Sequence, residues 1–133
     1  MKNIKKTISK FLILFCIVGS IFPTTLSKLI IIAEDGTFLG TFEDKYSKNS
    51  IYNKYGDYGS SYSSNSIFNK YGDYGSDYSQ YSPFNAYATK APWLVDGYGN
   101  YYGRLSINKY ASGVTNDSYK IALQLKALRD YLK

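Results

Sequence analysis

The sequence has no histidine, one cysteine and one methionine, and the methionine is its first residue. Histidine is the commonest general acid–base side chain and cysteine a strong nucleophile, so the usual equipment of hydrolytic and transfer enzymes is missing. The acidic pairs Glu34-Asp35 and Glu43-Asp44 are adjacent residues in predicted turns, not spaced catalytic partners. We therefore predict that the protein is not an enzyme and needs no cofactor.

Large aliphatic residues are missing from the middle of the chain. Between Tyr46 and Pro92 there is no Val, Leu or Met, and the only isoleucines are Ile51 and Ile67. The same stretch holds ten of the sixteen tyrosines. A hydrophobic core must therefore come mainly from the two ends of the chain.

The first 27 residues have the pattern of a secretory signal peptide. Four lysines precede the apolar run Phe11–Phe22, Pro23 follows it, and small residues then lead to Ser27. We predict cleavage after Ser27, with Ser20 and Ala33 as weaker alternatives, and a periplasmic, cell-surface or extracellular location. An uncleaved membrane anchor is the alternative, but twelve apolar residues fall short of the roughly 20 that span a bilayer.

The leader also carries the cysteine and much of the positive charge. Cys16 lies inside the apolar run, where the preceding Ile13-Leu14-Phe15 lacks the small residue that lipidation favours. Removing the four leader lysines lowers the formal net charge from +6 to +2. We therefore expect no disulfide and no nucleic-acid partner, and membrane contact only through the leader before its cleavage.

Residues 28–133 are predicted to form one small α+β domain. Strand-like runs flank Asp35-Gly36, which predicts a hairpin over 28–45 with a type I′ turn. Residues 93–110 align with it at an offset of 63 and predict a second hairpin. The two hairpins can join into one antiparallel sheet. Gly40 and Gly103, at equivalent positions, predict bulges or close packing.

The C-terminal residues 116–133 are predicted to form an amphipathic helix over one face of the sheet. Asn116-Asp117-Ser118 provides capping residues. The polar face includes Arg129, and a membrane-binding basic helix is the less favoured alternative. The predicted apolar stripe is Ile121, Leu125, Leu128 and Leu132, with Ala122 and Leu123 beside it.

A sixteen-residue repeat fills residues 46–92 between the hairpins. Asn49–Ser64 and Asn65–Gln80 match at thirteen of sixteen positions, and a decayed third copy begins at Tyr81. Such a repeat indicates an array of copied units. We read the serines Ser50 and Ser66 as caps of single helical turns, and Gly56 and Gly72 as their left-handed ends. Ala88 at the glycine position of the third copy argues that a left-handed backbone is not compulsory there. Disordered low complexity is the alternative.

The repeat tyrosines are the best candidates for a binding site. An aromatic face with a hydroxyl tip suits stacking on the sugars of a cell-envelope or extracellular polysaccharide, or contact with another envelope protein. Two alternatives remain: the rings pack inward, or the segments self-associate as a structural protein. An inhibitor or other soluble partner-binding role is more remote. The candidate residues are Tyr55, Tyr58, Tyr62, Tyr71, Tyr74 and Tyr78.

Calcium is a weaker possibility for the same segment. Asp57, Asp73 and Asp77 recur there with Asn and Ser oxygens nearby, but each unit has only one or two carboxylates. We read these aspartates as turn formers and predict no metal site.

The pattern SIFNKYGDYGS, flanked by DGTFLGTF and GNYYGRLSINKY, resembles that of small secreted bacterial proteins with tandem Ser-x-x-Asn-x-Tyr-Gly-x-Tyr-Gly-Ser repeats. The resemblance covers residues 30–110. It implies export and a bacterial source, and it brings no activity, cofactor or functional residue with it.

Overall fold

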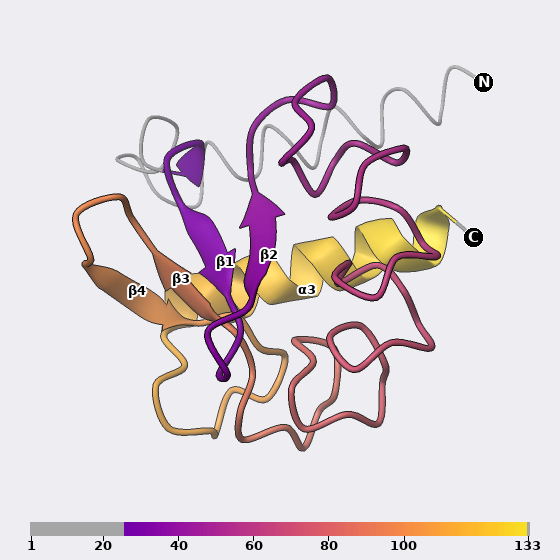
Figure 1. Ribbon diagram of the computed structural model, residues 1–133. Helices are drawn as coiled ribbons and strands as arrows, with labels where there is room; N and C mark the ends of the chain where they lie inside the picture. Colours follow the sequence, from indigo (N-terminus) through magenta and orange to yellow (C-terminus); the bar gives the residue numbers. More distant parts are fainter. Residues whose placement is uncertain (1–25, 133) are drawn as a thin grey trace.

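The computed structural model describes residues 26–132, so the predicted leader lies outside the described residues except for Leu26 and Ser27. The elements are β1 (Ile30–Ile32), β2 (Phe38–Thr41), β3 (Trp93–Val95), β4 (Tyr101–Arg104) and α3 (Asn116–Tyr131). The strands form one antiparallel sheet in the order β2-β1-β3-β4 (Figure 1). The α+β class and the joined hairpins are thereby confirmed.

Both hairpin loops differ from the predicted type I′ turn. A type I′ turn needs positive φ at both central residues, but Gly36 (φ 89°) is the only residue of the first loop with positive φ. The N–H of Gly36 donates to the carbonyl of Ala33 at 2.9 Å, and the N–H of Ala33 donates to the carbonyl of Thr37 at 2.8 Å. This is a three-residue loop that ends in a left-handed glycine. Gly99 (φ 84°) has the same place in the second hairpin.

The two hairpins are related by an approximate twofold arrangement. Strands β1 and β3 pair at the centre of the sheet, where Ile31 lies opposite its sequence equivalent, Leu94. Gly40 (φ 115°) and Gly103 (φ 108°) lie in the outer strands, each of which is joined to its inner neighbour with a register shift. The bulges predicted at these glycines are therefore confirmed.

Close packing at the two glycines is confirmed as well. A Cβ atom on Gly40 would lie 2.8 Å from Cβ of Tyr58, and one on Gly103 would lie 2.9 Å from the Thr115 side chain. Since carbon atoms pack at about 3.5–4.0 Å, neither position has room for a side chain.

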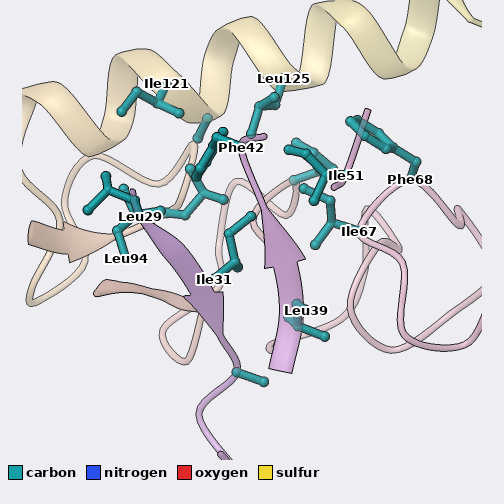
Figure 2. Packing of buried hydrophobic residues seen from close by; sticks show 14 residues of the cluster. Leu29, Ile31, Leu39, Phe42, Ile51, Ile67, Phe68, Leu94, Ile121 and Leu125 are labelled. Carbon is teal, nitrogen blue, oxygen red and sulfur yellow. The ribbon is translucent and has the colours of Figure 1, made fainter. Parts of the chain in front are cut away.

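Helix α3 covers one face of the sheet and then extends beside the repeats (Figure 1). Its buried apolar residues include Ile121 and Leu125, as predicted, and Figure 2 shows both side chains directed at the core between helix and sheet. The cap is Thr115, one residue before the predicted capping segment, and it forms a capping box with Ser118.

The apolar stripe of α3 ends earlier than predicted. Leu132 and Leu123 are exposed, whereas Arg129, predicted to lie on the polar face, is buried. The reason is that the last turns of the helix lie over the repeats and not over the sheet. Within residues 26–132, no helix is long and apolar enough to cross a membrane.

Candidate functional site

The repeat segment is a chain of three-residue turns. The N–H of Ser50 donates to the carbonyl of Ser47, that of Asn53 to Ser50, and that of Gly56 to Asn53, at 3.0–3.2 Å. The same bonds recur sixteen residues later between Ser63, Ser66, Asn69 and Gly72. Each sixteen-residue unit is therefore five triplets plus one glycine, Gly59 or Gly75. We call residues 47–62, 63–78 and 79–91 coils 1, 2 and 3.

In most triplets the first side chain fixes the backbone of the third residue, which is usually aromatic. The N–H of Tyr55 donates to Oδ1 of Asn53 at 3.1 Å, and the N–H of Tyr62 donates to Oγ of Ser60 at 3.1 Å. These side chain–backbone bonds define Asx and Ser turns. The predicted single helical turns are therefore wrong, because Ser50 and Ser66 accept in the same way from Tyr52 and Phe68 without starting a helix.

One asparagine in each coil also forms a hydrogen bond to the preceding turn. Nδ2 of Asn53, Asn69 and Asn85 donates to the carbonyl six residues earlier at 3.0–3.1 Å. The Oδ1 atom of each asparagine accepts a hydrogen bond from the N–H of the tyrosine two residues later, so one side chain fixes two segments of the chain. Asparagine suits this position because it is both donor and acceptor.

The glycines of the coils serve close approach, not a left-handed backbone. Gly56 and Gly72 do not have positive φ, which corrects the prediction for them and agrees with Ala88 at the equivalent position. Gly59 and Gly75 are more restricted. A Cβ atom on Gly59 would lie 2.7 Å from the carbonyl oxygen of Ile51 and still closer to that of Asn53.

One triplet in each coil faces the core. Ser50 and Ser66 are fully buried, and so are the isoleucines that follow them, Ile51 and Ile67. Figure 2 shows Ile51, Ile67 and Phe68 beside Leu125 and Phe42, so that the coils extend the core formed by sheet and helix. Most of the other triplets face solvent, but those that end in Tyr58 and Tyr74 are partly buried.

The six candidate tyrosines divide into two groups. Tyr55, Tyr62, Tyr71 and Tyr78 are 87%, 92%, 97% and 91% exposed. Tyr58 and Tyr74 instead pack against the core and contact the first hairpin. The Tyr58 ring lies edge-on to Phe38 with centroids 4.9 Å apart, and the Tyr74 hydroxyl donates to Asp35 at 2.8 Å. The predicted inward packing therefore holds for these two, and the outward presentation for the other four.

Tyr46, Tyr87 and Tyr110 are also exposed. Tyr46 and Tyr87 are in register with the candidates, because residues 46, 62 and 78 and residues 55, 71 and 87 are each sixteen apart. Tyr110 ends the partial fourth unit 106–110, in which Nδ2 of Asn108 donates to the carbonyl of Ala88 in coil 3. The tripeptide pattern Asx/Ser-x-Tyr would have found all three in the sequence.

Lysines accompany several of these tyrosines. The Lys45, Lys54 and Lys109 ammonium groups lie 5.2–5.3 Å from the ring centroid of the tyrosine that follows each of them. A cation at this distance is attracted by the aromatic face. Each such ring therefore has a positive charge beside it while most of its surface stays exposed.

Arg129 joins α3 to coils 2 and 3. Its guanidinium donates to the carbonyl of Gly75 at 2.9 Å and pairs with Asp77 at 2.7 Å. The guanidinium also lies over the Phe84 ring, 4.7 Å from its centroid. Asp77 is thus engaged in an ion pair, and within residues 26–132 no three metal-ligating side chains gather.

Comparisons of the chain with protein families, with curated proteins and with solved structures gave no match.

Proposed function

We propose that the protein is an exported, non-catalytic binder of a cell-envelope or extracellular polysaccharide. The binding surface is formed by the repeat tyrosines Tyr55, Tyr62, Tyr71 and Tyr78. The proposal depends on one observation: these side chains are 87–97% exposed although a side-chain hydrogen bond fixes the backbone of each. Fixed backbone leaves less conformational entropy to lose on binding.

The chemistry of the phenol ring suits a sugar ligand. The flat face packs on the apolar C–H face of a sugar ring, and the hydroxyl can exchange hydrogen bonds with ring substituents. Since equivalent tyrosines recur in successive coils, a polymer with repeating units can contact several rings at once. Simultaneous contacts raise the apparent affinity far above that of a single ring.

The location outside the cytoplasm follows from the predicted leader. A cut after Ser27 leaves the buried Leu29 and strand β1 in place, whereas a cut after Ala33 would remove an inner strand of the sheet. The absence of histidine and cysteine from residues 28–133 supports a binding role over a catalytic one.

Sedimentation with isolated cell-wall polysaccharide tests the binding. The purified protein should pellet with the polymer, and the variant Tyr55→Ala/Tyr62→Ala/Tyr71→Ala/Tyr78→Ala should stay in the supernatant. Tyr98→Ala is the matched control, because Tyr98 is 93% exposed but lies on the second hairpin loop. Equal pelleting of the quadruple variant would refute the proposal.

Self-association in the envelope or matrix is the second candidate, and the same exposed rings favour it. Light scattering without polymer distinguishes the two roles: growth of particles by the protein alone supports assembly. If the protein neither pellets nor scatters, a soluble partner is the remaining explanation.

A further inference from the structure

Tyrosine phenols are the main oxidisable groups on the surface of the domain. Cysteine and methionine are readily oxidised side chains, and the chain has only Cys16 and Met1, both outside residues 26–132. The single tryptophan, Trp93, is half-buried, with the Arg104 guanidinium 4.1 Å from its ring centroid. A one-electron oxidant that meets the folded domain therefore meets phenols first.

The accessible phenols form a well-defined set. Within residues 26–132, the tyrosine hydroxyls hydrogen-bonded to other described residues are those of Tyr74 and Tyr102. Eight other tyrosines are each at least 82% exposed, so both ring edge and hydroxyl are open to an oxidant. These are Tyr46, Tyr55, Tyr62, Tyr71, Tyr78, Tyr87, Tyr98 and Tyr110.

None of these eight rings touches another aromatic ring of the described residues. The aromatic pairs there are Phe38–Tyr58, Phe42–Tyr52 and Trp93–Tyr101. The turn bonds also hold the backbone of all eight tyrosines in place. No two of these exposed rings are paired within one copy, and all eight are open to the rings of a second copy.

We propose that the exposed tyrosines are sites of oxidative cross-linking between copies of this protein. The oxidant is hydrogen peroxide acting through a peroxidase. Each of two phenols loses one electron and one proton, and the two phenoxyl radicals join through a carbon–carbon bond between ortho positions. The ortho hydrogens return to the oxygens as the rings regain aromaticity. One peroxide is reduced to two waters for each dityrosine formed.

The number of exposed tyrosines in each copy determines the kind of cross-linked product. A copy with one site could only dimerise, whereas a copy with eight can link to several neighbours and build a branched network. Such a network would give covalent strength to a domain without disulfides. This inference goes beyond polysaccharide binding and does not depend on it.

The experiment treats a mixture of isotope-labelled and unlabelled protein with peroxidase and hydrogen peroxide. We expect a ladder of oligomers, dityrosine fluorescence, and cross-linked peptides that combine labelled and unlabelled chains. The linked residues should be drawn mainly from the eight exposed tyrosines. The packed tyrosines Tyr52, Tyr58, Tyr74 and Tyr102 should appear only when the reaction is run on urea-unfolded protein.

A variant with these eight tyrosines changed to Ser should give far fewer oligomers under the same conditions, with Tyr101, which is 67% exposed, as the main remaining site. If that variant does not fold, the map of cross-linked peptides from the unaltered protein tests the inference, because it shows which tyrosines are linked. Links that involve the packed tyrosines in folded protein, or links confined within one chain, would overturn the inference. Tyr→Phe changes separate it from polysaccharide binding, because phenylalanine keeps the stacking ring but cannot form a phenoxyl radical.

Discussion

At the scale of single residues, the repeat depends on short polar side chains that satisfy the backbone. The sequence identified Ser50 and Ser66 correctly as acceptors of a backbone N–H, but it could not distinguish a helix cap from a turn. Both motifs use the same hydroxyl, and the outcome is decided by the residues that follow. The sixteen-residue repeat concealed the three-residue period, because Gly59 and Gly75 interrupt the triplets once in coil 1 and once in coil 2.

The glycines allow a matched test of close packing. We predict that Gly59→Ala lowers the free energy of unfolding by about 1–3 kcal/mol, since its Cβ would overlap carbonyl oxygens of coil 1. Gly72→Ala should change it by less than about 1 kcal/mol, because its φ is ordinary, a Cβ there would meet only the Asn69 side chain at 3.2 Å, and Ala88 occupies the equivalent position of coil 3. Urea unfolding followed by circular dichroism measures both. Equal effects would contradict the assigned role of Gly59.

At the scale of secondary-structure elements, local signals predicted the hairpins and the helix well. Asp35-Gly36 and the offset of 63 located both hairpins, because turn residues and alternating apolar residues act over a few positions. The predicted type I′ turn was wrong, because Gly36 and Gly99 each end a three-residue loop. The burial of Arg129 could not be predicted, because helical periodicity does not reveal which segment packs over the last turn.

Arg129 provides the prediction at this scale. Arg129→Ala should lower the free energy of unfolding by about 2–3 kcal/mol, because it removes charge-assisted bonds to Gly75 and Asp77 and uncovers the Phe84 ring. Lys126→Ala is the control, since its pair with Asp130 is partly exposed and should contribute less than about 0.5 kcal/mol. Thermal unfolding compares the two variants. A loss no greater for Arg129 than for Lys126 would exclude Arg129 as the link between helix and coils.

At the scale of the whole molecule, contacts distant in sequence hold the coils to the framework. Tyr58 and Tyr74 occupy equivalent positions of coils 1 and 2, and both contact the first hairpin. Helix α3 spans sheet and coils, so one core serves both (Figure 2). The sequence predicted that some repeat tyrosines would pack inward, but only the long-range contacts identify which ones.

Carboxylates that anchor the loops predict a loss of stability in acid. Hydrogen bonds from Arg104 to Glu34 and from Thr37 to Asp35 lower the pKa of each carboxyl, and the N–H of Asn100 lowers the pKa of Asp96 to about 2. A lowered pKa in the folded state adds stability above the unfolded pKa of about 4, and this stability is lost as pH falls toward 2. The melting temperature should therefore fall across this range.

The Asp96→Asn variant tests the contribution of the second hairpin. It should have a lower melting temperature than the unaltered protein at neutral pH and a smaller decrease on acidification. A melting temperature that is constant from neutral pH to pH 2 in the unaltered protein would refute the stabilising role of these carboxylates.

The central claim is that the exposed repeat tyrosines, and not the packed ones, contact a polysaccharide. The most direct measurement is nuclear magnetic resonance of protein labelled on the tyrosine amide nitrogens, titrated with soluble cell-wall polysaccharide fragments. The signals of Tyr55, Tyr62, Tyr71 and Tyr78 should shift together with increasing ligand, while those of Tyr52 and Tyr102 stay in place. Shifts confined to packed tyrosines, or no shift at saturating fragment, would contradict the account.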